Sequence, residues 1–176
     1  RLCDSLCAVN PDVVFVASAL NDHLRAEQNW YASSDLSFVE YGALQLLDER
    51  FGGCRELSGF NVALFRALGI PCGIDRVVQN PHRIGSHMWT FMVDTNGRKL
   101  PYLWNYYNID REERMEEKYG KVYRDYFSVQ TTNWAVSYPD EDIPGILKKP
   151  FLRDVSDEYF GRNVAVVPLY DSAGDG

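Results

Sequence analysis

The stretch that decides the fold is "ERFGGCRELSGFNVALFRALGIPCGID", which runs from Glu49 to Asp75. It predicts a helix that begins near Cys54, because apolar residues recur there at helical spacing. This apolar side is formed by Leu57, Leu64, Phe65 and Leu68, with Asn61 among them. Gly69 stands where a left-handed C-terminal cap belongs, and Pro71 blocks continuation of the helix. A cysteine therefore occupies the first turn of a predicted helix, directly after two glycines.

Two further helices are predicted on the N-terminal side of this stretch. Asn10 and Pro11 are typical of an N-cap and a first helical position. The helix that follows would bury Val13, Val16, Ala17, Leu20 and Leu24. After "YASSDLS", Ser34 or Asp35 can cap a second helix, which Gly52 and Gly53 would end. Its apolar stripe would be Leu36, Val39, Ala43, Leu46 and Leu47.

On the C-terminal side of Pro71 the apolar period changes from helical to strand-like. The segments "CGIDRVVQ", "HMWTFMV" and "RKLPYLWNYY" predict strands, and "DTNG" predicts a hairpin turn between the last two. Asp110 can cap a short helix, "REERMEEKY", and "KVYRDYFSV" and "NVAVVPLY" predict further strands. Helices followed by an antiparallel sheet indicate an α+β fold. We expect a core domain over residues 1–132. Residues 133–176 would form a connector and a C-terminal strand region, where a further domain could start.

Composition and charge exclude several classes of protein. The chain has 176 residues, a net charge of −7 and a pI of about 4.9, which disfavours a nucleic-acid partner. No apolar run approaches the roughly 20 residues that span a bilayer. The four cysteines are too few for a disulfide scaffold, although Cys3 and Cys7 would share a helix face and could pair. No Cys/His cluster has the spacing of zinc ligands, so we predict no metal and no cofactor.

The position of Cys54 is typical of a nucleophile. A helix N-terminus carries unsatisfied N–H groups and a partial positive charge, which stabilise a thiolate. The preceding glycines would let the backbone approach a substrate and leave the sulfur uncrowded. The alternative is an ordinary buried cysteine, which is the commoner case. A thiol nucleophile also needs a base. Of the three histidines, His87 is the best candidate for this base because it lies at the start of a predicted strand.

The hairpin turn predicts which residue faces His87. If Gly97 takes the left-handed position of a three-residue loop, Asp94 pairs with Arg98. Counting residue by residue away from the loop along both strands then places Asn105 opposite His87, on the same face of the sheet. Its amide oxygen could accept a hydrogen bond from the imidazole and orient it. A loop one residue shorter or longer would turn Asn105 to the other face.

At this point the sequence resembles a known family. The segments "GGCRELSGFNVALFRALGIP" and "GSHMWTFMVDTNGRKLPY" resemble the transglutaminase-like superfamily of papain-type cysteine enzymes. The family motif is Gly-x-Cys before a helix that ends Arg-Ala-Leu-Gly-Ile-Pro, then His-x-Trp on a strand and Asp on the next strand. The resemblance covers roughly residues 38–107. "KVYRDYFSV" and "FLRDVSDEYF" look like the bacterial, Bacteroides-type members, which are often one domain of a larger exported protein.

The resemblance implies a papain-like α+β core in which N-terminal helices pack on an antiparallel sheet. It implies a Cys–His–Asp triad, with Cys54 as the nucleophile at a helix N-terminus and His87 as the base. The chain departs from the pattern at the third member, where Leu103 and Trp104 follow the Pro-aromatic pair. Either Asn105 replaces the aspartate, or the triad is degraded.

Two functions follow as expectations. The first is a cysteine-dependent acyl-transfer enzyme that acts on a peptide, protein or glycan-linked amide, with hydrolysis favoured over crosslinking. The second is a catalytically weak or inactive domain that binds peptides or glycans. Trp30, Trp89 and Trp104 are candidates for substrate binding, and core packing explains each of them as well. From the resemblance alone we expect an extracytoplasmic location, periplasmic or at the cell surface, as part of a longer polypeptide without a membrane span in this chain.

Overall fold

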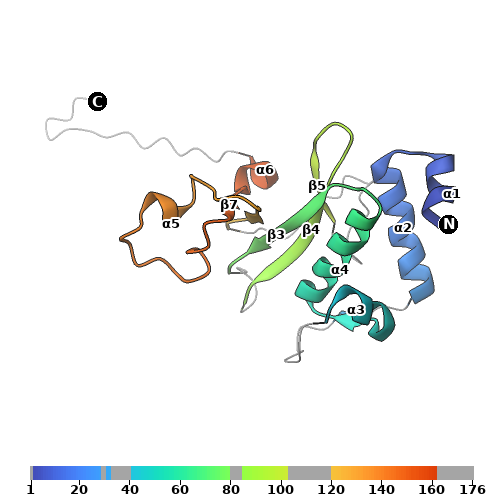
Figure 1. Ribbon diagram of the computed structural model, residues 1–176, viewed down its shortest axis with the longest axis horizontal. Coiled ribbons are helices and arrows are strands. Elements are labelled where there is room, and N and C mark those ends of the chain that lie inside the picture. The colour runs from blue at the N-terminus through green and yellow to red at the C-terminus, as the bar shows by residue number, and fades with distance from the viewer. Residues whose placement is uncertain (1, 29–30, 33–40, 80–84, 103–119, 162–176) are drawn as a thin grey trace, which may run out of the picture.

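The computed structural model describes residues 2–28, 31–32, 41–79, 85–102 and 120–161. Its helices are α1 (Leu2–Val9), α2 (Val13–Gln28), α3 (Ala43–Glu49), α4 (Cys54–Ala67), α5 (Trp134–Ser137) and α6 (Ser156–Phe160). Its strands are β1 (Tyr31–Ala32), β2 (Phe51–Gly52), β3 (Cys72–Val77), β4 (His87–Val93), β5 (Lys99–Tyr102), β6 (Tyr123–Asp125) and β7 (Leu152–Asp154). The antiparallel sheet has the order β5-β4-β3-β6-β7, and β1 pairs with β2 (Figure 1). The expected α+β fold is confirmed.

The helix α2 begins later than the sequence predicted. The Asp12 carboxylate accepts hydrogen bonds from the backbone N–H groups of Val14 and Phe15, at 3.0 and 3.1 Å. Asn10 instead accepts from the N–H of Asp12, at 3.0 Å, in a turn before the helix. The prediction of Asn10 as the N-cap was therefore wrong, because Asp12 offers an equally good acceptor two residues closer to the apolar run.

The helix α3 also ends earlier than predicted. Arg50, not Gly52, is its C-cap and takes a left-handed conformation with φ of 60°. Gly52 belongs instead to the short strand β2. Residues 33–40, which hold the predicted capping position, lie outside the described residues.

The helix α4 ends as the sequence predicted. Gly69 has φ of +75°, and the N–H groups of Gly69 and Ile70 donate to the carbonyls of Arg66 and Phe65, at 3.1 and 2.9 Å. This is the Schellman pattern that satisfies the last carbonyls of a helix. Pro71 follows, and β3 begins at the next residue. The chain is thereby turned from α4 directly into the centre of the sheet.

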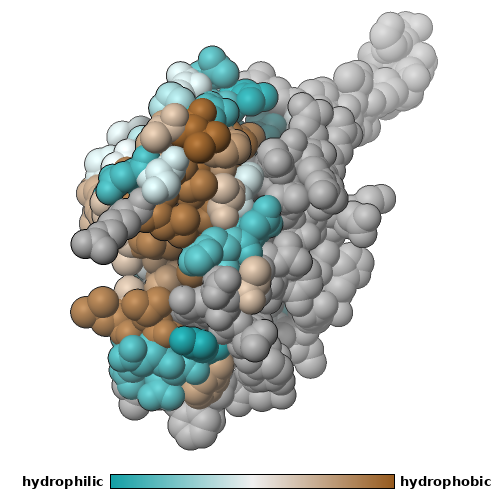
Figure 2. Space-filling view, turned by 90° about the vertical axis from the view of Figure 1, so that its right-hand side faces the viewer, coloured by the Kyte–Doolittle hydropathy of each residue, from teal (hydrophilic) through white to brown (hydrophobic). Residues whose placement is uncertain are grey.

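The sheet has a buried cluster on each face. On the first face, α4 packs on β3 and β4, and the ring of Phe65 meets that of Tyr102 in β5 edge to face at 4.7 Å. On the second face, Tyr159 and Phe160 of α6 pack against a buried cluster of Val77, Trp89, Val122 and Val155. Figure 2 looks onto the N-terminal helices and shows apolar side chains (brown) among polar ones on that surface. α1 and α3 carry the exposed Leu2, Val9, Leu44 and Leu47.

The C-terminal part of the described chain completes the same sheet. β7 pairs with β6, which in turn pairs with β3. The expected boundary at residue 132 thus falls between two neighbouring strands of one sheet. The segment between them, predicted as a connector, contains the short helix α5, which Asn133 caps by accepting from the Ala135 N–H at 2.8 Å. The predicted helix after Asp110 and the predicted strand "NVAVVPLY" lie outside the described residues.

The hairpin between β4 and β5 has the predicted register. The Asp94 N–H donates to the Arg98 carbonyl at 2.9 Å, and Gly97 has φ of +78°. Thr90 accordingly pairs with Tyr102. The Asp94 carboxylate fixes the loop, since it accepts from the backbone N–H groups of Asn96 and Arg98 at 2.9 and 2.8 Å. The three-residue loop Thr95-Asn96-Gly97 is therefore confirmed.

Candidate active site

Cys54 is the first residue of α4 and is partly exposed. Gly53 is the N-cap, and the Glu56 carboxylate accepts its backbone N–H at 2.9 Å. This bond closes the first turn in the manner of a capping box. The thiol thus lies at the positive end of a 14-residue helix whose first turn is fixed.

Gly52 is required by packing next to Cys54. A Cβ atom on Gly52 would lie 2.8 Å from Cβ of Glu56 and 3.0 Å from Cδ1 of Leu46. The first distance is too short for a side chain without a shift of α4, and the second would require the Leu46 side chain to move. The glycine before the cysteine therefore permits close approach of β2, α3 and α4. That reason differs from the access for substrate that the sequence suggested.

Cys54 and His87 lie at the same end of the structure. The Thr90 hydroxyl donates to the Ser58 carbonyl at 3.3 Å, and the Cys72 thiol, opposite Met92 of β4, contacts the Val62 carbonyl at 3.7 Å. α4 and β4 therefore run side by side in the same direction. One helical turn back from Ser58 is Cys54, and three residues back from Thr90 is His87. Each is the first residue of its element.

The pleat of β4 separates the two side chains across the strand. Thr90 contacts α4, so the alternate residues His87 and Trp89 are directed to the opposite face. The rings of His87 and Trp89 are 5.8 Å apart, and His87 pairs with Val77 of β3. A contact between His87 and the thiol requires the imidazole to reach round the end of the strand, which begins at His87.

The third predicted member of the triad, Asn105, lies outside the described residues, as do Trp30 and Trp104. The confirmed register of the β4–β5 hairpin is the one on which the Asn105 prediction rests. The role of Asn105 itself stays a prediction.

Trp89 belongs to the core of the protein. Its side chain is 1% exposed, and its indole N–H donates to the Tyr159 hydroxyl at 2.8 Å. The two rings also meet edge to face, at 5.7 Å. Trp89 therefore packs in the core, which was the alternative to substrate binding in the sequence analysis.

A buried polar network lies next to Trp89. The sequence analysis did not find this network. The Tyr159 hydroxyl donates to the Asp75 carboxylate at 2.6 Å, and Arg124 donates two bonds to the same carboxylate, each 2.7 Å. Arg124 also donates to Glu158 at 2.6 Å and lies over the Phe91 ring, 4.1 Å from its centre. Burial alone would lower the pKa of Arg124, but the hydrogen bonds with Asp75 outweigh it and raise this pKa.

The remaining cysteines differ from Cys54 in their surroundings. All four cysteines are free, so Cys3 and Cys7 do not pair. Burial raises the pKa of the Cys72 thiol, against the opposing charge of Arg66. In the described ranges, no three His, Cys, Asp or Glu side chains are grouped so that they could hold a metal ion. Nor does any helix in those ranges have the length and apolar character to cross a membrane.

Comparison with known proteins bears on the arrangement of Cys54 and His87. The sequence model of the transglutaminase-like superfamily matches residues 3–104, which is more than half of the chain and includes both residues. This chain belongs to the transglutaminase-like superfamily. Membership supports a cysteine enzyme at the level of the family. The match ends before β6, β7 and α6, so these C-terminal elements lie outside it.

A search of the curated proteins found no match. Among solved structures, the chain is similar to one described as "a Putative Cysteine Protease from Cytophaga hutchinsonii", with 22% identity and a TM-score of 0.40. That similarity covers 55% of this chain and 31% of the other, so this chain spans less than a third of that protein.

Proposed function

We propose that this transglutaminase-like domain is a cysteine-dependent amide hydrolase. Cys54 is the nucleophile, His87 the base and Asn105 the residue that orients the imidazole. The observation that supports the proposal is the placement of Cys54 and His87, which begin α4 and β4 at the same end of the structure, within the family match.

The chemistry follows the general scheme for a thiol nucleophile. The Cys54 thiolate attacks the carbonyl carbon, and the backbone N–H of Cys54 is a candidate donor to the developing oxyanion. His87 gives its proton to the leaving nitrogen as the C–N bond breaks, which leaves a thioester. Water then attacks the thioester and His87 accepts a proton from this water. The C–S bond breaks, the acid product leaves, and the Cys54 thiolate and His87 imidazolium are restored. An amine in place of water would give a crosslink. Water needs no dedicated acceptor site, and this favours hydrolysis.

The second candidate is a binding domain with weak or no catalysis. The β4 pleat favours it, because the pleat directs His87 to the face away from α4. In either case the substrate or ligand is a peptide, protein or glycan-linked amide. An extracytoplasmic location, within a longer polypeptide, is part of the same proposal and rests on the sequence resemblance.

Alkylation mapping separates the two candidates. Iodoacetamide at mildly acidic pH should modify Cys54 before Cys3, Cys7 and Cys72, and Cys54→Ala should abolish this fast reaction. His87→Gln should slow it and change its pH profile. The matched control is His23→Gln in α2, which alters an exposed histidine and should change neither. Preferential labelling of Cys72, or an unchanged profile in His87→Gln, would favour the binding domain.

A further inference from the structure

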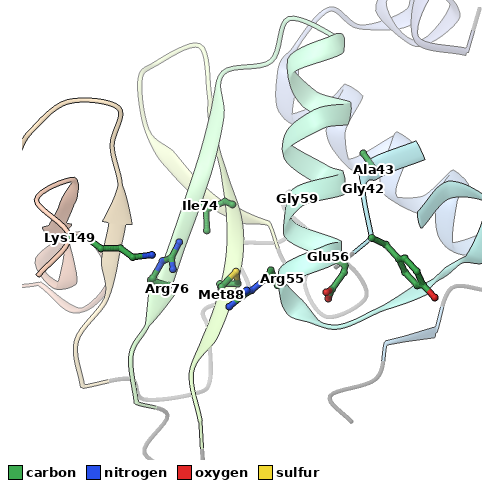
Figure 3. Close-up of a pocket in the computed structure, with 10 residues that line it drawn as sticks. Gly42, Ala43, Arg55, Glu56, Gly59, Ile74, Arg76, Met88 and Lys149 are labelled. Atoms are coloured by element: carbon green, nitrogen blue, oxygen red, sulfur yellow. The ribbon is translucent and has the colours of Figure 1, made fainter. Parts of the chain in front are cut away.

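A cleft of about 450 Å³ lies between the first turns of α4 and the face of β3 and β4 that packs against this helix (Figure 3). Its size falls within the range of small-ligand sites. The walls come from α4, from β3 and β4, from residues 41–43 at the start of α3, and from Lys149 in the segment before β7.

The cleft adjoins the first turn of α4, which holds Cys54, and the start of β4, where the side chain of His87 is directed to the opposite face of the strand. Arg55 and Glu56 line it and follow Cys54 directly in the first turn of α4. Met88 lines it from β4 and follows His87 directly. A group bound in this cleft would therefore lie beside a substrate held at Cys54.

The charge of the cleft is opposite to that of the protein. Three cationic side chains line it, Arg55, Arg76 and Lys149, against one carboxylate, Glu56. Glu56 already accepts the N–H of Gly53, and Arg76 forms an ion pair with Asp125, the last residue of the inner strand β6. In Figure 3, Lys149 and Arg55 extend toward Arg76 from opposite sides. The whole chain has a net charge of −7, so this is a local positive site on an acidic protein.

We propose that this cleft binds a carboxylate of the substrate next to the amide that Cys54 attacks. A substrate attacked within a peptide chain has no free α-carboxyl beside that amide, so the carboxylate belongs to an aspartate or glutamate side chain. Lys149, which lies beyond the family match, is then a specificity-determining residue. This inference rests on the proposed function, since it takes Cys54 as the reacting group.

The test compares two reagents that differ in charge, iodoacetate and iodoacetamide, at low ionic strength. The measured quantity is the ratio of their rate constants at Cys54. The field of the α4 N-terminus acts in every variant, so changes in the ratio report the side-chain charges alone. Lys149→Gln should lower the iodoacetate rate by about threefold, because the carboxylate of the reagent loses the attraction of one cationic side chain. It should leave the iodoacetamide rate unchanged, and about 1 M salt should abolish the difference between the variants.

Lys148→Gln is the matched control. Lys148 is the neighbouring residue, does not line the cleft and pairs with Asp142 at 3.7 Å, so its loss should leave the ratio unchanged. Arg55→Gln, which removes a second cleft charge, should lower the ratio as Lys149→Gln does. The proposal is overturned if Lys149→Gln leaves the ratio unchanged, or if Lys148→Gln lowers it equally. If Cys54 nevertheless reacts with iodoacetamide in a His87-dependent manner, the proposed enzyme stands and the carboxylate site alone fails.

Discussion

The indole N–H of Trp89 donates a hydrogen bond to the hydroxyl oxygen of Tyr159, 2.8 Å away and 70 residues later in the sequence. Trp89 belongs to the His-x-Trp segment of β4, whereas Tyr159 belongs to α6, beyond the family match. Because the rings of Trp89 and His87 are 5.8 Å apart, a residue outside the matched region holds the neighbour of the proposed base.

Removal of the Tyr159 hydroxyl should destabilise the protein. Tyr159→Phe removes the acceptor of the Trp89 indole N–H and one of the two donors to Oδ2 of Asp75 in the core. We expect a loss of about 1–3 kcal/mol in the free energy of unfolding, measured by urea denaturation. Tyr138→Phe, at an exposed tyrosine, should change it by less than about 0.5 kcal/mol. Equal effects of the two variants would contradict the structural role of this hydroxyl.

The ion pair of Asp75 and Arg124 should show strong coupling. These side chains are 0% and 2% exposed, so the loss of Arg124 leaves the Asp75 charge buried without its ion-pair partner, and the loss of Asp75 leaves Arg124 with Glu158 alone. Asp75→Leu and Arg124→Leu should each cost about 3–5 kcal/mol of unfolding free energy. The double variant should cost clearly less than the two losses added together. Additive losses in this double-mutant cycle would show that the pair is not formed in solution.

Glu158 should make the stability depend on pH. Partial burial alone would raise the pKa of Glu158, but the hydrogen bond from Arg124 outweighs it and holds this pKa below its usual value. The stabilisation is therefore fully present above the unfolded-state pKa of about 4.3 and is lost as the pH falls through the lower folded-state pKa. The stability difference between the parent and Glu158→Gln should be largest near neutral pH and should shrink below about pH 4. Urea unfolding across this range measures it, and a difference independent of pH would argue against the pair.

Charge at residue 105 should control the reactivity of Cys54. An aspartate would stabilise the His87 imidazolium more than the uncharged Asn105 does. Asn105→Asp should therefore raise the alkylation rate of Cys54, and Asn105→Ala should lower it. Asn96→Asp is the control, since it adds the same charge in the hairpin loop at the opposite end of β4. Identical rate profiles for the three residue-105 proteins would mean that Asn105 faces away from His87.

The elements that sequence analysis predicted well are those with local signals. The helix after Cys54, its cap at Gly69 and the hairpin at Gly97 depend on residues within one turn of each other, and all three are confirmed. The N-cap of α2 was misplaced because Asn10 and Asp12 give nearly the same local signal. Of the candidate site, the sequence predicted Cys54 and His87, and the structure has both at the same end of the molecule.

The parts that sequence analysis missed depend on contacts between distant residues. Asp75 and Arg124 are 49 residues apart, and Asp75 and Tyr159 are 84 apart, so no periodicity in the sequence joins them. The pairing of β7 with β6 and the presence of Lys149 in the cleft were missed for the same reason. Only the folded sheet brings these residues together.

The close approach at Gly52 affects how related sequences can be interpreted. Because a Cβ there would lie 2.8 Å from that of Glu56, any chain that keeps this turn needs glycine at this position, whether or not its thiol reacts. The glycine thus reports the backbone geometry and carries no information about activity. In a relative that has lost the cysteine, a retained glycine would indicate an intact fold rather than an enzyme. The residues aligned with Cys54 and His87 are therefore the ones that distinguish a catalyst from a binding domain.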